Sequence, residues 1–278
     1  MSGAADLHAV TTSLRAAGRK ALVPYLTAGF PSLAEGPALL EAVAAAGCRV
    51  VEIGVPFSDP VADGPVIQAA AARALAQGTT LADCLELAAR AAALELVPVL
   101  MTYVNPVLAM GWERFAAAAA DAGAGGVILP DVPLEESAPA REALRAAGLA
   151  LVDLVAPTSG PARTERIART ARGFLYVVSH TGVTGGDAAL DAALAPLMAR
   201  VRAVTDTPCY VGFGIGTPER ARAAAALADG VVVGSALLRV VENAEPAARP
   251  EAARTFLASL AAAAEAAGGA ANGEETPS

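Results

Sequence analysis

The feature that most constrains this chain is a regular alternation of short apolar runs with alanine-rich stretches of helical length. The apolar runs are rich in β-branched residues and nearly continuous, which is typical of strands in a parallel sheet that helices cover on both faces. Eight such units in about 250 residues favour an α/β fold of the (β/α)8 TIM-barrel type over a doubly wound open sheet, which usually has about five to seven strands. The expected strands are residues 21–27, 49–54, 97–103, 125–129, 149–155, 173–179, 208–213 and 230–235.

The segments outside this alternation complete the expected domain. Residues 6–18 indicate an extra N-terminal amphipathic helix that is placed to plug the bottom of the barrel. We expect a single barrel domain over residues 1–267 and a polar, disordered tail over residues 268–278, with no interdomain linker. The expected helices lie around residues 35–46, 65–93, 112–122, 135–147, 161–171, 190–204, 218–227 and 251–267.

The charge balance limits the possible partners. The chain has 20 Lys and Arg against 28 Asp and Glu, a net charge of −8, whereas nucleic acids and anionic membranes attract clustered basic residues. We therefore expect no nucleic acid and no membrane, and the first residues lack the pattern of a signal peptide. Cys48, Cys84 and Cys209 have no metal-type spacing, which indicates reduced, structural cysteines and a cytoplasmic location.

The loop after the second expected strand carries the residues best suited to chemistry. Glu52 lies near the end of an apolar strand, where an unpaired carboxylate is costly and its pKa should rise. The alternative is a structural Glu that pairs with an arginine or the backbone. Asp63 precedes Gly64 and Pro65 at a helix start, so a plain N-cap competes with a catalytic role. Two carboxylates in different surroundings suit separate acid and base roles, while Asp59 is better explained as a turn or partner contact.

Three glycine-rich segments follow the last three expected strands. They are residues 181–186, 212–216 and 234–235. Glycine exposes backbone N–H groups, and these groups bind phosphate without a cation when a helix begins nearby. TIM barrels often build a phosphate site from the loops after strands seven and eight. The sequence thus predicts a phosphorylated small-molecule substrate, and Gly185-Gly186 is a candidate hinge for a lid.

The rarity of lysine and histidine excludes two other ways of breaking a carbon–carbon bond. The only lysine is Lys20, which lies just before the first strand at the opposite end of the barrel from a Schiff-base nucleophile. The only histidines are His8 and His180, too few and too far apart for a metal site, so we expect no metal. His180 either touches substrate or is an ordinary loop residue. What remains is carboxylate chemistry on a substrate that supplies its own electron sink.

Several motifs resemble the tryptophan synthase α-subunit family over residues 20–240. The most specific is E-x-G-x-P-F-S-D-P-x-A-D-G-P at residues 52–65, and residues 23–31, 103–106, 129–133, 182–185 and 212–215 also match. The resemblance implies the retro-aldol cleavage of indole-3-glycerol phosphate to indole and glyceraldehyde 3-phosphate. It further implies that Asp63 holds the indole N–H and that Glu52 moves the protons at ring C3 and at the glycerol hydroxyl.

The resemblance also implies the remaining site and the partner. The family's partner is a β subunit that carries pyridoxal phosphate, so this chain should need no cofactor and should join an α2β2 heterotetramer. Two alternatives stay open: a stand-alone lyase that releases indole, and a non-catalytic barrel that regulates a β partner. By resemblance, the substrate contacts are Tyr25, Ile67, Ile128, Tyr176, Thr184 and Phe213, the phosphate contacts are Gly185, Gly214, Gly234 and Ser235, and the partner interface includes Phe57, Asp59, Pro60, Asn105, Pro106 and Pro133.

Overall fold

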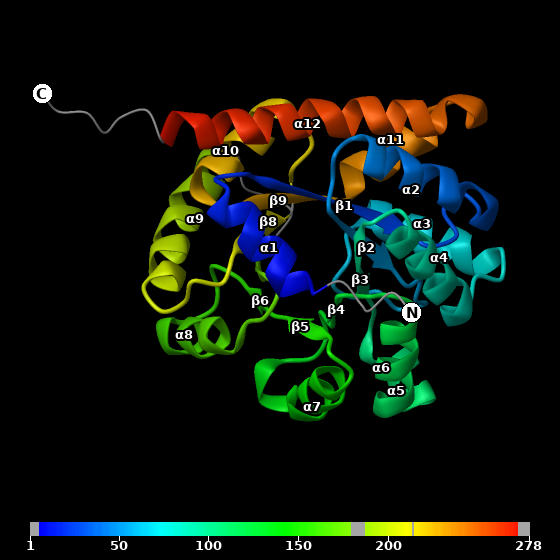
Figure 1. The fold of residues 1–278 in the computed structure, drawn as a ribbon, viewed down its shortest axis with the longest axis horizontal. Coiled ribbons are helices and arrows are strands. Elements are labelled where there is room, and N and C mark those ends of the chain that lie inside the picture. Colours follow the sequence, from blue (N-terminus) through cyan, green and yellow to red (C-terminus); the bar gives the residue numbers. More distant parts are fainter. Residues whose placement is uncertain (1–5, 179–186, 213, 272–278) are drawn as a thin grey trace, which may run out of the picture.

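The computed structural model describes residues 6–178, 187–212 and 214–271, and its strands form a single parallel sheet (Figure 1). The strands are β1 (Ala21–Thr27), β2 (Val50–Gly54), β3 (Val97–Met101), β4 (Gly126–Ile128), β5 (Ala150–Val152), β6 (Leu154–Val155), β7 (Leu175–Val178), β8 (Cys209–Gly212) and β9 (Gly230–Val233). Their order is β5-β4-β3-β2-β1-β9-β8-β7-β6, so every strand pairs with its sequence neighbours except β5 and β6, and β1 pairs with the last strand, β9.

The two strands at the ends of this order are halves of one predicted strand. β5 and β6 are separated at Asp153, and β5 pairs with β4 while β6 pairs with β7. The carbonyl of Asp153 accepts a hydrogen bond from the Tyr176 N–H at 2.9 Å, and its carboxylate accepts one from Arg141. The chain itself therefore closes the sheet at Asp153, and the predicted eight-unit (β/α)8 barrel is confirmed.

The helices surround the barrel. They are α1 (Leu7–Ala16), α2 (Gly36–Ala45), α3 (Pro65–Ala76), α4 (Leu81–Ala93), α5 (Val104–Met110), α6 (Trp112–Asp121), α7 (Ala138–Ala146), α8 (Pro161–Thr170), α9 (Asp187–Arg202), α10 (Pro218–Leu227), α11 (Ser235–Asn243) and α12 (Arg249–Ala271). Two of these helices, α5 and α11, are not predicted by the sequence pattern. Asn105-Pro106 is a strong turn signal, but proline within the first turn of a helix lacks only an N–H that would be unpaired there anyway. Ser235 was assigned to the last strand, whereas it begins α11.

The barrel interior is packed, and α1 closes its amino-terminal end as predicted. Leu7 is 1% exposed and belongs to the interior cluster, together with residues such as Val23, Val50 and Tyr210. The hydroxyl of Thr11 donates to the Gly173 carbonyl at 2.6 Å, and Asp6 caps the helix by accepting the N–H groups of residues 8 and 9. Because this end is filled, substrate can reach the interior only from the carboxyl ends of the strands.

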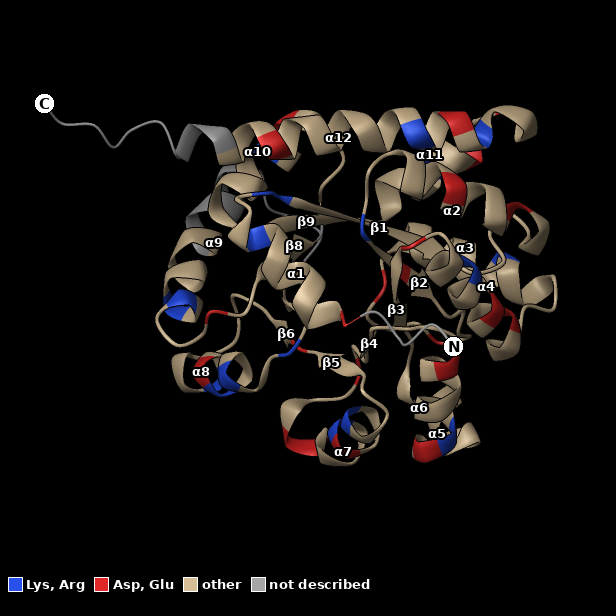
Figure 2. Cartoon of the chain, viewed as in Figure 1, with Lys and Arg blue, Asp and Glu red and all other residues tan. Residues whose placement is uncertain are grey.

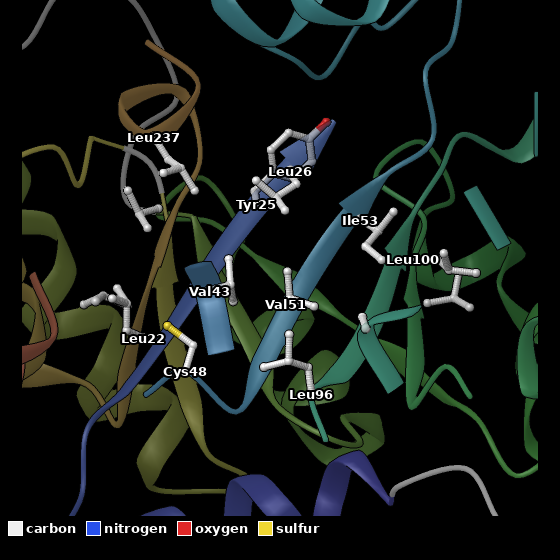
Figure 3. Packing of buried hydrophobic residues seen from close by; sticks show 14 of the residues in the cluster. Leu22, Tyr25, Leu26, Val43, Cys48, Val51, Ile53, Leu96, Leu100 and Leu237 are labelled. Carbon is white, nitrogen blue, oxygen red and sulfur yellow. The ribbon is translucent and has the colours of Figure 1, made fainter. Parts of the chain in front are cut away.

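A second core lies between the sheet and the helices. Figure 3 shows Val51 and Ile53 of β2 beside Leu22 and Leu26 of β1, all of them buried and outside the interior cluster. Alternate residues of each strand thus face the two cores, as the nearly continuous apolar runs predicted. On β2 the interior positions are Val50 and Glu52, which places a carboxylate inside the barrel.

The carboxyl-terminal helix is longer than predicted. α12 lies across the outside of the barrel and continues to Ala271, past residue 267, the predicted end of the domain (Figure 1). Gly268 does not end it, because the helix approaches the loop before β1: a Cβ at Gly268 would lie 3.0 Å from the Gly18 carbonyl oxygen. This close packing compensates for the low helix propensity of glycine. The rest of the predicted tail, residues 272–278, lies outside the described residues.

Charged residues of both signs share the outer helices. Figure 2 shows Lys and Arg interspersed with Asp and Glu on α7, α8 and α12. Examples are Arg163, which pairs with Glu135 at 2.7 Å, and Arg169, which pairs with Glu165 at 2.6 Å. Among the helices that the structure describes, none is long and apolar enough to cross a membrane.

Candidate active site

Glu52 lies inside the barrel near the carboxyl end of β2. It is 1% exposed, it stands opposite Tyr25 of β1 and Val99 of β3, and its Oε1 has no hydrogen-bond partner within the described chain. Burial raises the pKa of this carboxyl to about 8. No ion pair of Glu52 occurs among the described residues, so the structural alternative of an arginine-paired Glu finds no support there. The protonated form of Glu52 is favoured at neutral pH.

Asp63 lies in the loop between β2 and α3, and it does not cap the helix. The N-cap of α3 is Gly64, so the N-cap alternative is wrong. Instead the carboxylate oxygen Oδ2 of Asp63 accepts a hydrogen bond from the Tyr103 hydroxyl at 3.1 Å. Burial raises the pKa of Asp63 to about 6, and the bond from Tyr103 opposes that rise. Asp63 is therefore mainly ionised at neutral pH, where Glu52 is mainly protonated.

Two tyrosines lie beside both carboxylates. Burial is the largest cause of the raised pKa values of Tyr25 and Tyr176, and Glu52 and Asp63, in their ionised forms, raise both pKa values further. The Tyr25 hydroxyl lies at the carboxyl end of β1 (Figure 3). It accepts a hydrogen bond from the Thr27 hydroxyl at 3.3 Å. The structure thus brings the predicted residues Tyr25 and Tyr176 together with the predicted pair of acids.

Glycines at two strand ends make room for these tyrosine hydroxyls. A Cβ at Gly54, the last residue of β2, would lie 2.0 Å from the Tyr25 hydroxyl oxygen. A Cβ at Gly212, the last residue of β8, would lie 2.1 Å from the Tyr176 hydroxyl oxygen. From the sequence, Gly212 is expected only as part of a phosphate loop, and no role is expected for Gly54. A steric role for a glycine depends on which distant ring lies over it, and local sequence does not show this.

Two further predicted substrate residues, Ile67 and Ile128, differ in how deeply they are buried. Ile67, in the first turn of α3, is half-buried. A Cβ added at Gly234 would lie 3.7 Å from the Cδ1 of Ile67. The same Cβ would lie 3.6 Å from Tyr25 Cβ, so the predicted phosphate end and the aromatic wall meet here. Ile128, at the end of β4, is fully buried in the interior cluster. Thr184 and Phe213 lie outside the described residues.

The predicted phosphate site includes the start of α11. Gly234 is the N-cap of this helix, and the half-buried Ser235 is its first residue, so N–H groups of the first turn lack helical partners there. Gly214 has a positive φ of 76°, and the Arg220 guanidinium donates to its carbonyl at 2.8 Å. The sequence predicts a phosphate site of backbone amides alone, and this arginine beside the loop is an addition that the structure shows. Gly185, the fourth predicted phosphate residue, lies outside the described part.

The loops predicted to face a partner contact one another. The Phe57 ring stacks on Tyr103 with centroids 5.2 Å apart, and the Val104 N–H donates to both carboxylate oxygens of Asp131 at 3.1 and 3.0 Å. Val61 and Leu108 are exposed here, at 73% and 54%. Asp59, Asn105 and Pro133 are also exposed, and Pro60 and Pro106 are half-buried. Next to these loops, residues 130–134 and 153–156 line most of a cavity of about 290 Å³.

No group of three or more His, Cys, Asp or Glu residues that could hold a metal ion occurs in the described part of the chain. The site therefore consists of two carboxylates with separated pKa values, an aromatic wall and a helix start suited to phosphate. Such a set can exchange protons with an anionic aromatic substrate.

Comparison with known proteins agrees with this geometry. Residues 11–267 match the family described as tryptophan synthase alpha chain. The tryptophan synthase alpha chain of Geobacter sulfurreducens is 47% identical over 243 residues, covering 87% of this chain and 92% of that protein. The one from Chloroflexus aggregans is 47% identical over 254 residues, covering 91% and 95%.

Solved structures give the same result. The tryptophan synthase from M. tuberculosis in its aminoacrylate- and BRD0059-bound form superposes with a TM-score of 0.85 at 35% identity, covering 94% of this chain and 99% of that one. Tryptophan synthase subunit alpha from Legionella pneumophila superposes with a TM-score of 0.86 at 35% identity, covering 95% and 100%. By its sequence and its fold, the chain belongs to the tryptophan synthase alpha chain family.

Proposed function

We propose that Glu52 and Asp63 are the catalytic residues of the family reaction, the cleavage of indole-3-glycerol phosphate to indole and glyceraldehyde 3-phosphate. A member of this family is a carbon–carbon lyase of tryptophan biosynthesis. The observation that carries the assignment is the buried Oε1 of Glu52, which has no hydrogen-bond partner in the described part of the chain and lies at a strand end opposite Tyr25. Leaving a buried polar atom unpaired costs stability, so such an atom at a strand end of a barrel is typical of a functional site.

The roles follow from the two protonation states. Glu52 starts protonated and gives its proton to ring C3, which leaves a positive charge on the indole nitrogen. Asp63 starts ionised, accepts the indole N–H and balances that charge. The Glu52 carboxylate then takes the proton of the glycerol hydroxyl next to the ring. The bond between C3 and the glycerol carbon breaks, its electron pair returns to the ring, and the hydroxyl carbon becomes the aldehyde. Glu52 ends protonated, ready for the next cycle.

The rest of the site binds the two ends of the substrate. Tyr25, Tyr176, Ile67, Ile128 and Phe213 would enclose the indole ring and the reacting carbons. Gly234 and Ser235 at the start of α11, with Gly214 and Gly185, would hold the phosphate through backbone N–H groups. Arg220 adds positive charge beside Gly214. Thr184 would belong to a lid that meets Asp63.

A β subunit is the partner that we propose for this chain. Val61, in the loop after β2, and Leu108, in α5, are large apolar side chains that the chain alone leaves exposed, and the proposed partner would cover them. Phe57, Asp59, Pro60, Asn105, Pro106 and Pro133 would contact the partner in an α2β2 heterotetramer. Pyridoxal phosphate belongs to that subunit, and the alpha chain uses no cofactor. Three free, buried cysteines fit the reduced cytoplasm that we expect for both chains.

The test is the appearance of indole when the purified chain meets indole-3-glycerol phosphate. Wild type should release indole, while Glu52→Gln should keep the fold and lose at least about 10²-fold in kcat, the low end for loss of a general acid–base group. A Glu52→Gln variant with near-normal turnover would exclude Glu52 as the proton carrier. The same assay with an added β subunit separates the alternatives, because a cleavage rate unchanged by the β subunit would favour a stand-alone lyase.

A further inference from the structure

The residue that holds Asp63 is itself held rigidly. Tyr103 follows β3 and is 3% exposed. On one side, the N–H of Thr102 donates to the Ile128 carbonyl at 3.1 Å, and on the other the N–H of Val104 donates to the Asp131 carboxylate. These bonds tie the backbone around Tyr103 to β4 and to the loop after it. The Phe57 ring stacks on the tyrosine ring with an interplanar angle of 23°. Both the backbone and the ring of Tyr103 therefore have little freedom.

The hydroxyl of Tyr103 has one donor and one acceptor, and these fix the direction of its proton. The N–H of Ala62 donates to the Tyr103 oxygen at 3.0 Å, so the hydroxyl proton is free to point at Asp63, 3.1 Å away. Burial and the charge of Asp63 raise the pKa of Tyr103, so the hydroxyl stays protonated across the working range. The bond to the ionised carboxylate is charge-assisted, the stronger kind of hydrogen bond.

We propose that Tyr103 is a positioning residue that holds the carboxylate of Asp63 in its ionised form and in the direction required by the indole N–H. The proposal rests on the proposed function of Asp63. The side chain of an aspartate in a loop has two rotatable bonds. The Ala62 N–H and the Phe57 ring fix Tyr103, and the Tyr103 hydroxyl in turn restricts the Asp63 carboxylate before substrate arrives. Tyr103 acts through Asp63 and needs no contact with substrate of its own.

The hydrogen bond from Tyr103 is the main interaction that stabilises the ionised form of Asp63 among the described residues. The groups that sense the charge of Asp63 are the tyrosines Tyr25, Tyr176 and Tyr103. The Asp131 carboxylate is bound by the Val104 N–H, and Glu52 is mainly protonated at neutral pH. In the described chain no arginine or lysine is paired with Asp63. Loss of the Tyr103 hydroxyl therefore favours the protonated, inactive form of Asp63, and its pKa rises.

The test is Tyr103→Phe in the full chain, with the cleavage rate measured from pH 5 to pH 9. We expect kcat to fall about 10-fold, the effect of one hydrogen bond to a charged group, and the acid limb of kcat/KM to move to higher pH by about half a pH unit or more. An acid limb that coincides with that of wild type would overturn the proposal, whatever happens to kcat, because a merely structural role leaves this limb in place.

Two companion variants make the result specific. Tyr210→Phe is the matched control, since the buried Tyr210 hydroxyl has no hydrogen-bond partner among the residues that the structure describes, and this variant should keep the wild-type pH profile. In an Asp63→Asn background, Tyr103→Phe should change the residual rate by less than about twofold, because the charge that it supports is gone. Near-normal turnover of Asp63→Asn alone would refute the role of Asp63. If Asp63→Asn is impaired but the acid limb of kcat/KM in Tyr103→Phe stays where it is in wild type, only the positioning role of Tyr103 is refuted.

Discussion

The hydroxyl of Tyr176 fills the space that a side chain at position 212 would need: a Cβ on Gly212 would lie 2.1 Å from the hydroxyl oxygen and 2.4 Å from the ring carbon that bears it. Tyr176 belongs to β7 and Gly212 to β8, and the two strands are paired. The position of the tyrosine beside Glu52 and Asp63 therefore depends on the absence of one methyl group on the neighbouring strand.

We predict that Gly212→Ala displaces the Tyr176 ring and lowers kcat/KM at least about 10-fold, since overpacking a filled site costs about 1–3 kcal/mol. Gly160→Ala is the control, because a Cβ there meets nothing within 4 Å. Steady-state cleavage of indole-3-glycerol phosphate by both variants is the measurement. Equal activity of Gly212→Ala and wild type would show that the tyrosine is not needed where the structure places it.

The pH dependence of cleavage should follow the two carboxyl groups. The proposed active form has Asp63 ionised and Glu52 protonated, with pKa values raised by burial to about 6 and about 8. Activity should fall below the lower value, where Asp63 gains a proton, and above the higher value, where Glu52 loses its proton. We therefore predict a bell-shaped profile of kcat/KM with its maximum near neutrality. A profile that stays level from pH 5 to pH 9 would contradict the assignment of these two groups.

The same burial of Glu52 should cost stability at high pH. Its pKa is raised from an ordinary value of 4.5 to about 8, so the folded state binds a proton more tightly than the unfolded state. Stability is therefore greatest below the unfolded value and falls as pH rises toward 8. Glu52→Gln has no carboxyl group and therefore lacks this penalty. Its free energy of unfolding minus that of wild type should be larger at pH 9 than at pH 6, by on the order of 2 kcal/mol. Urea unfolding of both proteins at pH 6 and at pH 9 measures this difference. A difference between variant and wild type that is the same at the two pH values would refute the prediction.

Much of the fold and site could be predicted because the signals are local. Runs of apolar residues determine strand positions to within a few residues, and strand order follows from the barrel closing on sequence neighbours. Glu52 stands out because it interrupts an apolar strand, and Asp63 because it lies in the same unusual loop.

The features that were missed depend on residues far apart in sequence. The bond between Tyr103 and Asp63 spans 40 positions, and Tyr103 is the N-cap of α5, the helix that Asn105-Pro106 concealed. The split of the fifth strand depends on β4 and β7 binding its two halves. Steric roles of Gly54 and Gly212 depend on tyrosines of other strands. In each case the sequence contains the residue, but the role arises only from the closed barrel.

The start of α11 offers a direct test of the phosphate site. Gly234 is its N-cap and has Tyr25 and Ile67 beside it, so an aspartate at position 234 would place a negative charge where the phosphate is expected. Two like charges a few ångströms apart near a protein surface repel by on the order of 1–4 kcal/mol. Substrate binding should weaken more than the chemical step, since the phosphate is bound equally in the ground state and the transition state. We predict that Gly234→Asp raises KM at least about 10-fold and changes kcat less.

The matched control is Gly160→Asp. Gly160 is the N-cap of α8, a position where aspartate is favourable, and a Cβ there meets nothing within 4 Å. It adds the same charge at a helix start on another unit of the barrel, so its KM should stay near that of wild type. A similar rise of KM in both variants would indicate general repulsion of the anionic substrate by the protein. An unchanged KM in Gly234→Asp would mean that the phosphate binds elsewhere. Only a rise confined to position 234 places the phosphate at the start of α11.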